Sequence, residues 1–453
     1  MKINWKILCA ATVLTAGAGG SGHAQEGALT QQKLGQMREA YQPTPAERAL
    51  HNAINVADIG QLAANADARN NLTDSFKYRV PSDGITDQKS SGRCWLFTGL
   101  NVLRAQAMRQ HDIKHLEFSQ GYNFFYDQLE KANLFLQTVI DTSEKPMDDR
   151  KVDWLFHNAL SDGGQFTGVA DIIGKYGVVP SEAMPETYVT QHTRTFSNLL
   201  AQKLKEWGLE LRDMAGKGAR PAALEARKDQ MLTDVYRMLC QTMGTPPRTF
   251  SWRGKKYTPQ SFYNELLGND LRGGYVMFMN DPTRPYYKMY EIDLDRHVYD
   301  GENWTYLNVP MQDIKEMAMA SIQDSTAMYF SCDVAKFLNR DNGTLDLENY
   351  DYGAILGTTF GMDKAQRIIT GASASSHAMT LVGVDVDDNG VSVKWLIENS
   401  WGNGANRGHL IATDRWMDEY LFRLVVERRF VPERLLKLLD QKPRLLPCWD
   451  PMF

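Results

Sequence analysis

A single cysteine, Cys94, stands where a helical pattern begins. The preceding Ser90-Ser91-Gly92 is a turn signal, and apolar residues at helical spacing run from Cys94 to His111. A thiol at a helix N-terminus faces unpaired backbone N–H groups and the positive end of the helix dipole, and both favour the thiolate. Because the thiolate is the reactive form, we take Cys94 as the candidate nucleophile.

The residues around Cys94 supply what such a nucleophile needs. Arg93 adds positive charge, and Gly92 permits close approach of a substrate carbonyl. Gln88, a little upstream, brings a neutral amide donor, which suits an oxyanion that develops only in the transition state.

A reactive cysteine usually works with a histidine that a third group orients. His377 follows a run of small residues and begins an apolar strand pattern, whereas His51, His192 and His297 sit in polar surroundings. Asn399 follows the second strand of the same predicted hairpin. Its amide oxygen can accept a hydrogen bond from one ring nitrogen, and Trp401 can shield that bond from water.

Each of these residues has an ordinary structural interpretation when taken alone. A lone cysteine at a helix start is more often a buried core thiol, and a lone histidine before a strand is more often structural. The combination of Gln88, Cys94, His377 and Asn399 favours a thiol enzyme. Core or rim packing is the expectation for the remaining cysteines of the mature chain: Cys240, Cys332 and Cys448.

The elements that must position these residues change along the chain. Helical patterns dominate the first half and end in long helices over residues 199–243, before Pro246-Pro247. Residues 250–310 are mixed, and residues 308–332 predict a helix followed by a strand. The broad layout is helices first and strands later, which predicts an α+β fold.

The segment around His377 predicts a hairpin. Residues 378–384 and 391–397 look like strands, and Asp387-Asp388-Asn389-Gly390 between them is a turn signal. Residues 417–439 then predict a return to helix.

Composition excludes several classes of protein. The chain has 453 residues, 43% of them hydrophobic and 23% charged, which excludes extended disorder and collagen-like structure. Its formal net charge is −5, so no basic excess argues for nucleic acid. Five cysteines are too few for a disulfide scaffold. The sequence still allows one disulfide to form.

The first residues predict an export signal. Lys2 and Lys6 precede an apolar stretch, and small residues lead to a cleavage site after Ala24. The apolar core is shorter than the roughly 20 residues that a membrane anchor needs. We therefore expect residues 1–24 to be a signal peptide that includes Cys9, a mature chain without a membrane span, and a periplasmic or extracellular location.

Several segments together resemble the papain-like cysteine peptidases, and within them the bleomycin hydrolase and aminopeptidase C family. The Gln-x5-Cys-Trp spacing, the later histidine and Asn-Ser-Trp-Gly carry the general resemblance. The closer resemblance, to the bleomycin hydrolase and aminopeptidase C family, rests on segments spread over most of the mature chain: residues 88–97, 118–133, 162–165, 176–188, 331–334, 376–379, 398–402 and 449–452.

This resemblance implies a two-domain fold with a helical left domain, a β-barrel right domain and a large, mainly helical insertion. The corresponding divisions are a signal peptide (1–24), an N-terminal helical arm (25–80), a helical half with the cysteine (81–190), the insertion (191–310) and a β-rich half with the C-terminal tail (311–453).

The resemblance also implies roles for individual residues. Cys94 is the nucleophile, His377 the general base and acid, Asn399 the orienter and Gln88 the oxyanion donor. The residues implied in substrate binding are Asp162, Gly163, Gly164, Trp401 and Phe453. No metal or organic cofactor is implied, and the partners are peptide substrates.

The implied reaction is amide hydrolysis through an acyl-enzyme, with removal of residues from peptide N-termini. The family's tail usually runs a few residues beyond the Trp-Asp-Pro-Met segment, whereas here Phe453 follows Met452 directly. The expectation from that departure is that dipeptidyl or internal cleavage accompanies aminopeptidase action. Members of the family assemble as hexamers, so a homo-oligomer is expected, and the negative net charge argues against nucleic acid binding.

Two other functions stay open at this point. The same residues can catalyse acyl or amide transfer, or hydrolysis, on a non-peptide substrate. A non-catalytic scaffold is the third interpretation, although such a protein usually loses its cysteine or histidine.

Overall fold

The computed structural model describes residues 25–70, 72–82 and 84–453. The predicted signal peptide and Cys9 lie outside these residues. The chain divides into two compact units, one up to Leu62 and one from Ala63 to Phe453. Within the described residues no helix combines the length and apolar character needed to cross a bilayer.

The first unit is helical. Thr30 caps α1, and a capping box between Thr44 and Glu47 begins α2, which Pro45 opens. Neither helix has a buried residue. Their bounds are α1 (Gln31–Ala40) and α2 (Pro45–Ile54), and α3 (Ile59–Ala63) runs to the division between the units.

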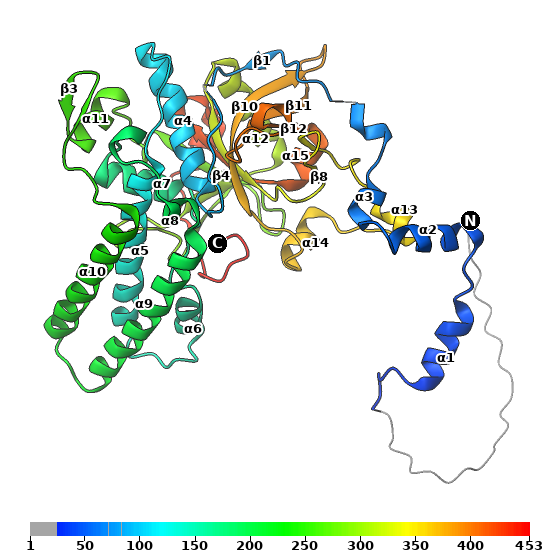
Figure 1. Cartoon of the computed structure of the whole chain (residues 1–453), viewed down its shortest axis with the longest axis horizontal. Coiled ribbons are helices and arrows are strands. Elements are labelled where there is room, and N and C mark those ends of the chain that lie inside the picture. The colour runs from blue at the N-terminus through cyan, green and yellow to red at the C-terminus, as the bar shows by residue number, and fades with distance from the viewer. Residues whose placement is uncertain (1–24, 71, 83) are drawn as a thin grey trace, which may run out of the picture. The chain divides into compact units, whose positions relative to one another are not determined.

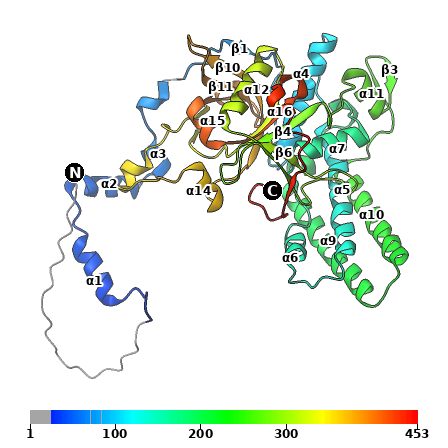
Figure 2. The ribbon, with the colours of Figure 1, turned by 180° about the vertical axis from the view of Figure 1, so that it is seen from behind.

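In the second unit, the longest helices come before most of the strands along the chain. Figures 1 and 2 show α9 and α10 running beside α5, and α4 between the helices and the sheet. The α-helices of this part are α4 (Cys94–His111), α5 (Gln120–Asp141), α6 (Arg150–His157), α7 (Phe166–Tyr176), α8 (Tyr188–Gln191), α9 (Thr193–Gly216), α10 (Pro221–Met243) and α11 (Pro259–Leu266).

The sheet holds most of the later chain. Its order is β14-β5-β6-β4-β13-β7-β10-β11-β12-β9-β8, and β1 pairs with β10. Its strands are β1 (Tyr78–Arg79), β4 (Tyr275–Met279), β5 (Lys288–Ile292), β6 (Thr305–Asn308), β7 (Met328–Cys332), β8 (Leu338–Asn339), β9 (Thr344–Leu345), β10 (His377–Val386), β11 (Ser392–Glu398), β12 (His409–Thr413), β13 (Leu421–Glu427) and β14 (Arg444–Leu446).

Shorter elements complete this unit. A separate hairpin joins β2 (Phe250–Trp252) to β3 (Lys255–Tyr257). The later helices are α12 (Met311–Gln323), α13 (Tyr352–Leu356), α14 (Lys364–Ile369), α15 (Asp414–Tyr420) and α16 (Glu433–Leu436). Four 3-10 turns lie at η1 (Asp67–Asn70), η2 (Ser181–Ala183), η3 (Ala405–Gly408) and η4 (Arg428–Phe430).

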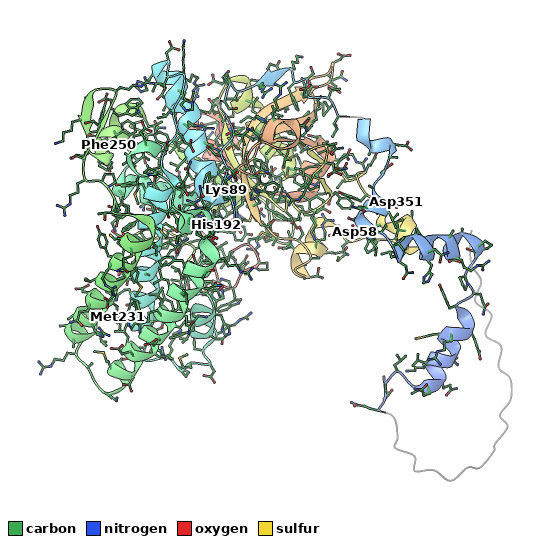
Figure 3. The ribbon with its side chains drawn as sticks, viewed as in Figure 1. Asp58, Lys89, His192, Met231, Phe250 and Asp351 are labelled. Carbon is green, nitrogen blue, oxygen red and sulfur yellow. The ribbon has the colours of Figure 1, made fainter. Side chains whose placement is uncertain are left out.

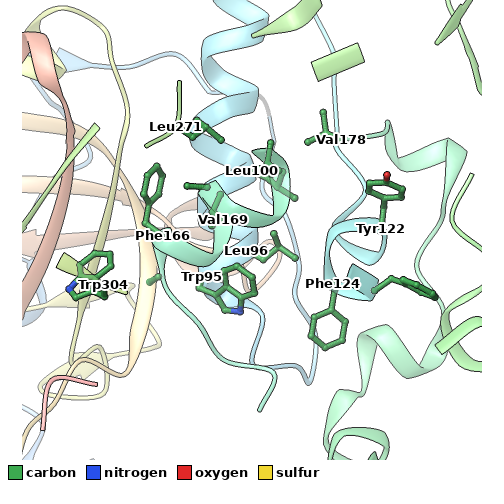
Figure 4. Packing of buried hydrophobic residues seen from close by; sticks show 14 of the residues in the cluster. Trp95, Leu96, Leu100, Tyr122, Phe124, Phe166, Val169, Val178, Leu271 and Trp304 are labelled. Atoms are coloured by element: carbon green, nitrogen blue, oxygen red, sulfur yellow. The ribbon is translucent and has the colours of Figure 1, made fainter. Parts of the chain in front are cut away.

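Helix α4 is buried nearly all round, which suits its central place between two cores. Figure 4 shows Trp95, Leu96 and Leu100 of α4 packed with Phe166 and Val169 of α7. This helical core extends along α10, where Met231 is fully buried (Figure 3). A second core lies between the sheet and helices α12 and α15.

One predicted helix is wrong, and two ranges expected to be mainly helical also contain strands. Within 417–439, only the ends are helical, because Leu421–Glu427 forms the central strand β13, buried on both faces. A continuous apolar run of that length fits a buried helix as well as a buried strand. Strands β4–β6 fall inside the range 191–310, and β1 falls inside 25–80.

Candidate active site

Cys94 is the first residue of α4, as the sequence predicts. Its neighbour Arg93 is the N-cap, and no side chain of the described residues caps this helix. The thiol is half-buried and not in a disulfide. The uncapped helix start therefore directs backbone N–H groups at the space around the sulfur.

His377 and Asn399 come together across neighbouring strands. His377 begins β10, and Asn399 directly follows β11, which pairs with β10 in antiparallel register. Nε2 of His377 lies 2.9 Å from Oδ1 of Asn399. An amide oxygen only accepts, so Nε2 carries the proton, and the other ring nitrogen is left for Cys94. Trp401 stacks on the imidazole at 4.9 Å between ring centroids.

Cys94 and His377 perturb each other's pKa. Burial alone would raise the pKa of the thiol, but the His377 charge and hydrogen bonds from His377 and from backbone N–H groups lower it below its usual value. Burial favours the neutral imidazole, but the Cys94 thiolate and the Asn399 hydrogen bond raise the pKa of His377 above its usual value. The two shifts favour a thiolate–imidazolium pair.

Gln88 bridges the two sides of this site. Its backbone N–H donates to the Ser400 carbonyl at 2.8 Å, and its side-chain oxygen accepts from the Ser400 hydroxyl at 2.7 Å. Nε2 donates to the Ser91 carbonyl at 2.6 Å. An amide nitrogen carries two hydrogens, so one remains for a substrate oxygen.

Asp162 ties the cysteine loop to the cleft segment. Its carboxylate accepts from the Gly92 N–H at 2.7 Å and from the Thr193 hydroxyl, and its carbonyl accepts from the Trp95 indole at 2.9 Å. A Cβ at Gly92 would collide with that carboxylate. The Asp162 side chain is therefore engaged within the protein, while Gly163 beside it lines the cleft.

A buried ionic network supports the glycine segment from behind. Nδ1 of His297 lies 2.5 Å from Oδ1 of Asp127, which also pairs with Lys131 at 2.9 Å. Lys131 donates to the Gly163 carbonyl at 2.5 Å. The His297 ring packs on Trp95 and fills the space that a side chain at Gly164 would need. The polar setting of His297 in the sequence concealed this role.

The site opens onto a cavity of about 550 Å³. Its walls include Cys94, His377, Gln88, Gly163, Gly164 and Phe453. The Phe453 ring packs edge-on against Trp154 at 4.7 Å. Four of the five residues expected to bind substrate thus lie at the cavity or on the histidine: Gly163, Gly164, Phe453 and Trp401.

The cavity wall also carries a buried acid that the sequence did not single out. Asp295 is 4% exposed, and its Oδ2 accepts from Nε2 of Gln165 at 2.5 Å. Burial raises the pKa of Asp295 to about 7 despite the opposing charge of Arg423. Oε1 of Gln165 is buried and has no partner among the described residues.

A thiol on a buried helix facing a histidine on an antiparallel strand of a mixed sheet defines the papain-like class of cysteine peptidases. Comparison with known proteins narrows this class. The chain matches the Peptidase C1-like family over residues 28–453. It belongs to that family and is a thiol-dependent peptidase.

Individual relatives agree with this assignment. Bleomycin hydrolase of Mus musculus is 39% identical over 402 residues, covering 83% of this chain and 88% of the relative. Aminopeptidase G of Lactobacillus delbrueckii subsp. lactis is 37% identical, covering 93% and 98%. The crystal structure of PepW from Lactobacillus rhamnosis superposes with a TM-score of 0.89 at 34% identity, covering 94% and 99%.

Proposed function

We propose that this protein removes residues from the N-termini of peptides, with Cys94 as nucleophile and His377 as general acid and base. The observation that carries the proposal is the contact of the Cys94 thiol with an imidazole that Asn399 orients. Asn399 also accepts from the Ser400 N–H at 2.8 Å, which fixes the amide oxygen on the histidine.

In the first half of the reaction the Cys94 thiolate attacks the scissile carbonyl carbon. The carbonyl π electrons move to the oxygen, where the free Gln88 Nε2–H and the backbone N–H groups at the start of α4 donate to it. His377 then gives its proton to the leaving nitrogen as the C–N bond breaks. A thioester on Cys94 and a free amine result.

In the second half His377 is neutral and acts as a base. It removes a proton from water while the water oxygen attacks the thioester carbonyl. Collapse of this intermediate breaks the C–S bond and releases the carboxylic acid fragment. The thiolate and the imidazolium are restored, so no cofactor takes part in the steps as proposed.

Recognition of a free N-terminus is supported by the chemistry of the cavity and by relatives named aminopeptidase. Asp295 and Gln165 both line the cavity, and the Asp295 carboxylate offers acceptor oxygens there. A protonated α-amino group bound there adds a positive charge beside the buried carboxylate, whose pKa stays raised although the Arg423 charge opposes this. We assign Asp295 as the counter-ion of the substrate amine on this basis.

The test compares fluorogenic aminoacyl amides with N-acetylated and dipeptidyl counterparts under reducing conditions. We expect hydrolysis of the free aminoacyl amides, little hydrolysis of the acetylated ones, and none by Cys94→Ala. Equal rates on acetylated substrates would overturn N-terminal recognition. Full activity of Cys94→Ala would overturn the assigned nucleophile.

We also propose that the chain is exported and assembles as a hexamer. Export is supported by the charged, apolar and small-residue pattern of residues 1–24, and the hexamer by the family resemblance. N-terminal sequencing of the secreted protein should begin at Gln25, and light scattering should give about six chain masses. A mature N-terminus at Met1 would contradict export with cleavage, and a monomer would contradict the hexamer.

A further inference from the structure

Arg340 occupies a fixed turn beside the active site. It directly follows β8, in the turn that leads to β9. Oδ1 of Asn339 accepts from the Asp341 N–H at 3.0 Å, and Asn406 donates to the Asn342 carbonyl at 2.7 Å. These bonds hold the turn on both sides of Arg340, although its own side chain is exposed.

The Arg340 guanidinium belongs to a stack that ends on the catalytic histidine. Its central carbon lies 4.6 Å from the centroid of a Trp401 ring. That ring system in turn stacks on His377 at 4.9 Å with 28° between the planes. Such a contact holds a flexible cation in place by attraction to the ring face. The charge is close enough to act on the pKa of His377, which it lowers.

Two members of the stack, Trp401 and Arg340, do not line the cavity in which we place the acyl part of a substrate. The cavity walls include His377, Gly163 and Gly164, but neither Trp401 nor Arg340. In the proposed reaction His377 must reach the leaving nitrogen. With the acyl part in the cavity, the departing fragment therefore passes along the Trp401 side of the imidazole.

The described residues place no carboxylate within ion-pair range of Arg340, so its charge is available to a ligand. We propose that Arg340 binds a carboxylate of the departing peptide fragment and thereby selects substrates that are acidic on that side. This inference rests on the proposed function. It adds a preference at the opposite end of the substrate from the amine that Asp295 faces.

Reach limits where the carboxylate can be. The distances of 4.6 and 4.9 Å along the stack place the guanidinium within about 10 Å of the imidazole, which is the span of about three extended residues. Two sources fit this reach. One is an acidic side chain directly after the scissile bond, and the other is the terminal carboxylate of a very short peptide.

Three dipeptides separate the two sources. Leu-Glu-amide offers only the side-chain carboxylate, Leu-Gln with a free C-terminus offers only the terminal one, and Leu-Gln-amide offers neither. Release of leucine gives kcat/KM for each. We expect the unaltered protein to prefer one or both acidic substrates over the neutral amide, and the preference to shrink as salt rises.

The variant Arg340→Gln should lower the acidic-over-neutral ratio of kcat/KM by about three- to fivefold, the range of an exposed charge pair. Arg253→Gln is the matched control, because Arg253 also lies over a tryptophan, Trp252, at 4.4 Å but in the separate β2–β3 hairpin. The control should keep the ratio of the unaltered protein.

A second measurement does not depend on hydrolysis. Iodoacetate and iodoacetamide alkylate Cys94 as an anion and as a neutral molecule, and Arg340→Gln should lower the ratio of the two rates while Arg253→Gln should not. Absence of cleavage of every peptide would contradict the proposed function alone. An acidic-over-neutral ratio of kcat/KM that is equal for Arg340→Gln and the unaltered protein would overturn the role of Arg340. Where no peptide is cleaved, an equal ratio of the two alkylation rates would overturn it.

Discussion

At the residue scale, the electrostatic balance of the site depends on two buried groups that stabilise each other's charge. Burial of His377 opposes its protonation, and the Cys94 thiolate is the main influence that reverses this. Burial of Cys94 opposes its ionisation in the same way, and His377 reverses that. Each residue thus has the pKa that catalysis needs only in the presence of the other.

This dependence predicts the titration of Cys94→Ala. Without the thiolate, burial is the dominant influence on His377 and Arg340 acts in the same direction, so the pKa of the imidazole should fall from above its usual value to below it. NMR titration of the ring protons measures this directly. A pKa that stays raised in Cys94→Ala would show that the imidazolium does not depend on the thiolate.

The buried acid on the cavity wall gives a second prediction at this scale. The pKa of Asp295, about 7, means that the carboxylate is protonated below neutrality and ionised above it. A peptide α-amino group stays protonated up to a pKa of about 8. KM for free aminoacyl amides should therefore fall as pH rises from about 6 to 7.5.

Asp295→Asn keeps the shape and removes the charge. We expect KM for free aminoacyl amides to rise about tenfold with a smaller change in kcat, as for a lost charged contact of about 1.4 kcal/mol. Its KM should also lose the dependence on pH between about 6 and 7.5. An unchanged KM would show that the amine binds elsewhere in the cavity.

At the element scale, the site depends on how helix α4 is joined to the segment before α7. Asp162 accepts from Gly92 ahead of the helix and from Trp95 in its first turn. Its contact with Thr193 extends the connection to the start of α9. These bonds fix the position of Cys94 relative to the glycines that line the cavity.

Asp162→Ala should therefore lower kcat by more than its loss of unfolding free energy alone would explain. Loss of a charged, part-buried acceptor costs about 1–3 kcal/mol in the free energy of unfolding, and a displaced cysteine loop should lower kcat at least tenfold. Thr258→Ala is the control, because Thr258 caps the remote helix α11 and its loss costs about 1 kcal/mol. Chemical denaturation and kcat for both variants separate the two effects, and equal kcat values would contradict the role of Asp162.

The same scale shows what sequence patterns can predict. Helix α4 has the predicted bounds, and the β10–β11 hairpin brings His377 to Asn399 as predicted, because both depend on local periodicity and turn chemistry. Residues 421–427 form strand β13 instead of the predicted helix, and their burial on both faces leaves no alternation in the sequence to mark a strand. The contacts of Asp162 and Asp295 could not be predicted, since each partner comes from a distant segment of the chain.

At the scale of the whole molecule, the four described cysteines are distributed over both halves without forming a disulfide. Cys332 and Cys448 are fully buried, and burial raises the pKa of both thiols. Cys94, in contrast, is partly exposed, and its pKa is lowered. The fold is therefore held by its two cores, and thiol reactivity is concentrated at the active site.

This distribution predicts that oxidation separates activity from stability. Mild hydrogen peroxide should modify Cys94 first and abolish peptide hydrolysis, because the thiolate is the form that oxidises. The melting temperature should stay the same with and without a reductant, since no described disulfide contributes to it. Peptide mass spectrometry locates the modified thiol, and calorimetry gives the melting temperature. Modification of Cys332 at a rate equal to that of Cys94 would show that burial does not protect the other thiols as their pKa shifts predict. A melting temperature that falls on reduction would show that a disulfide stabilises the fold.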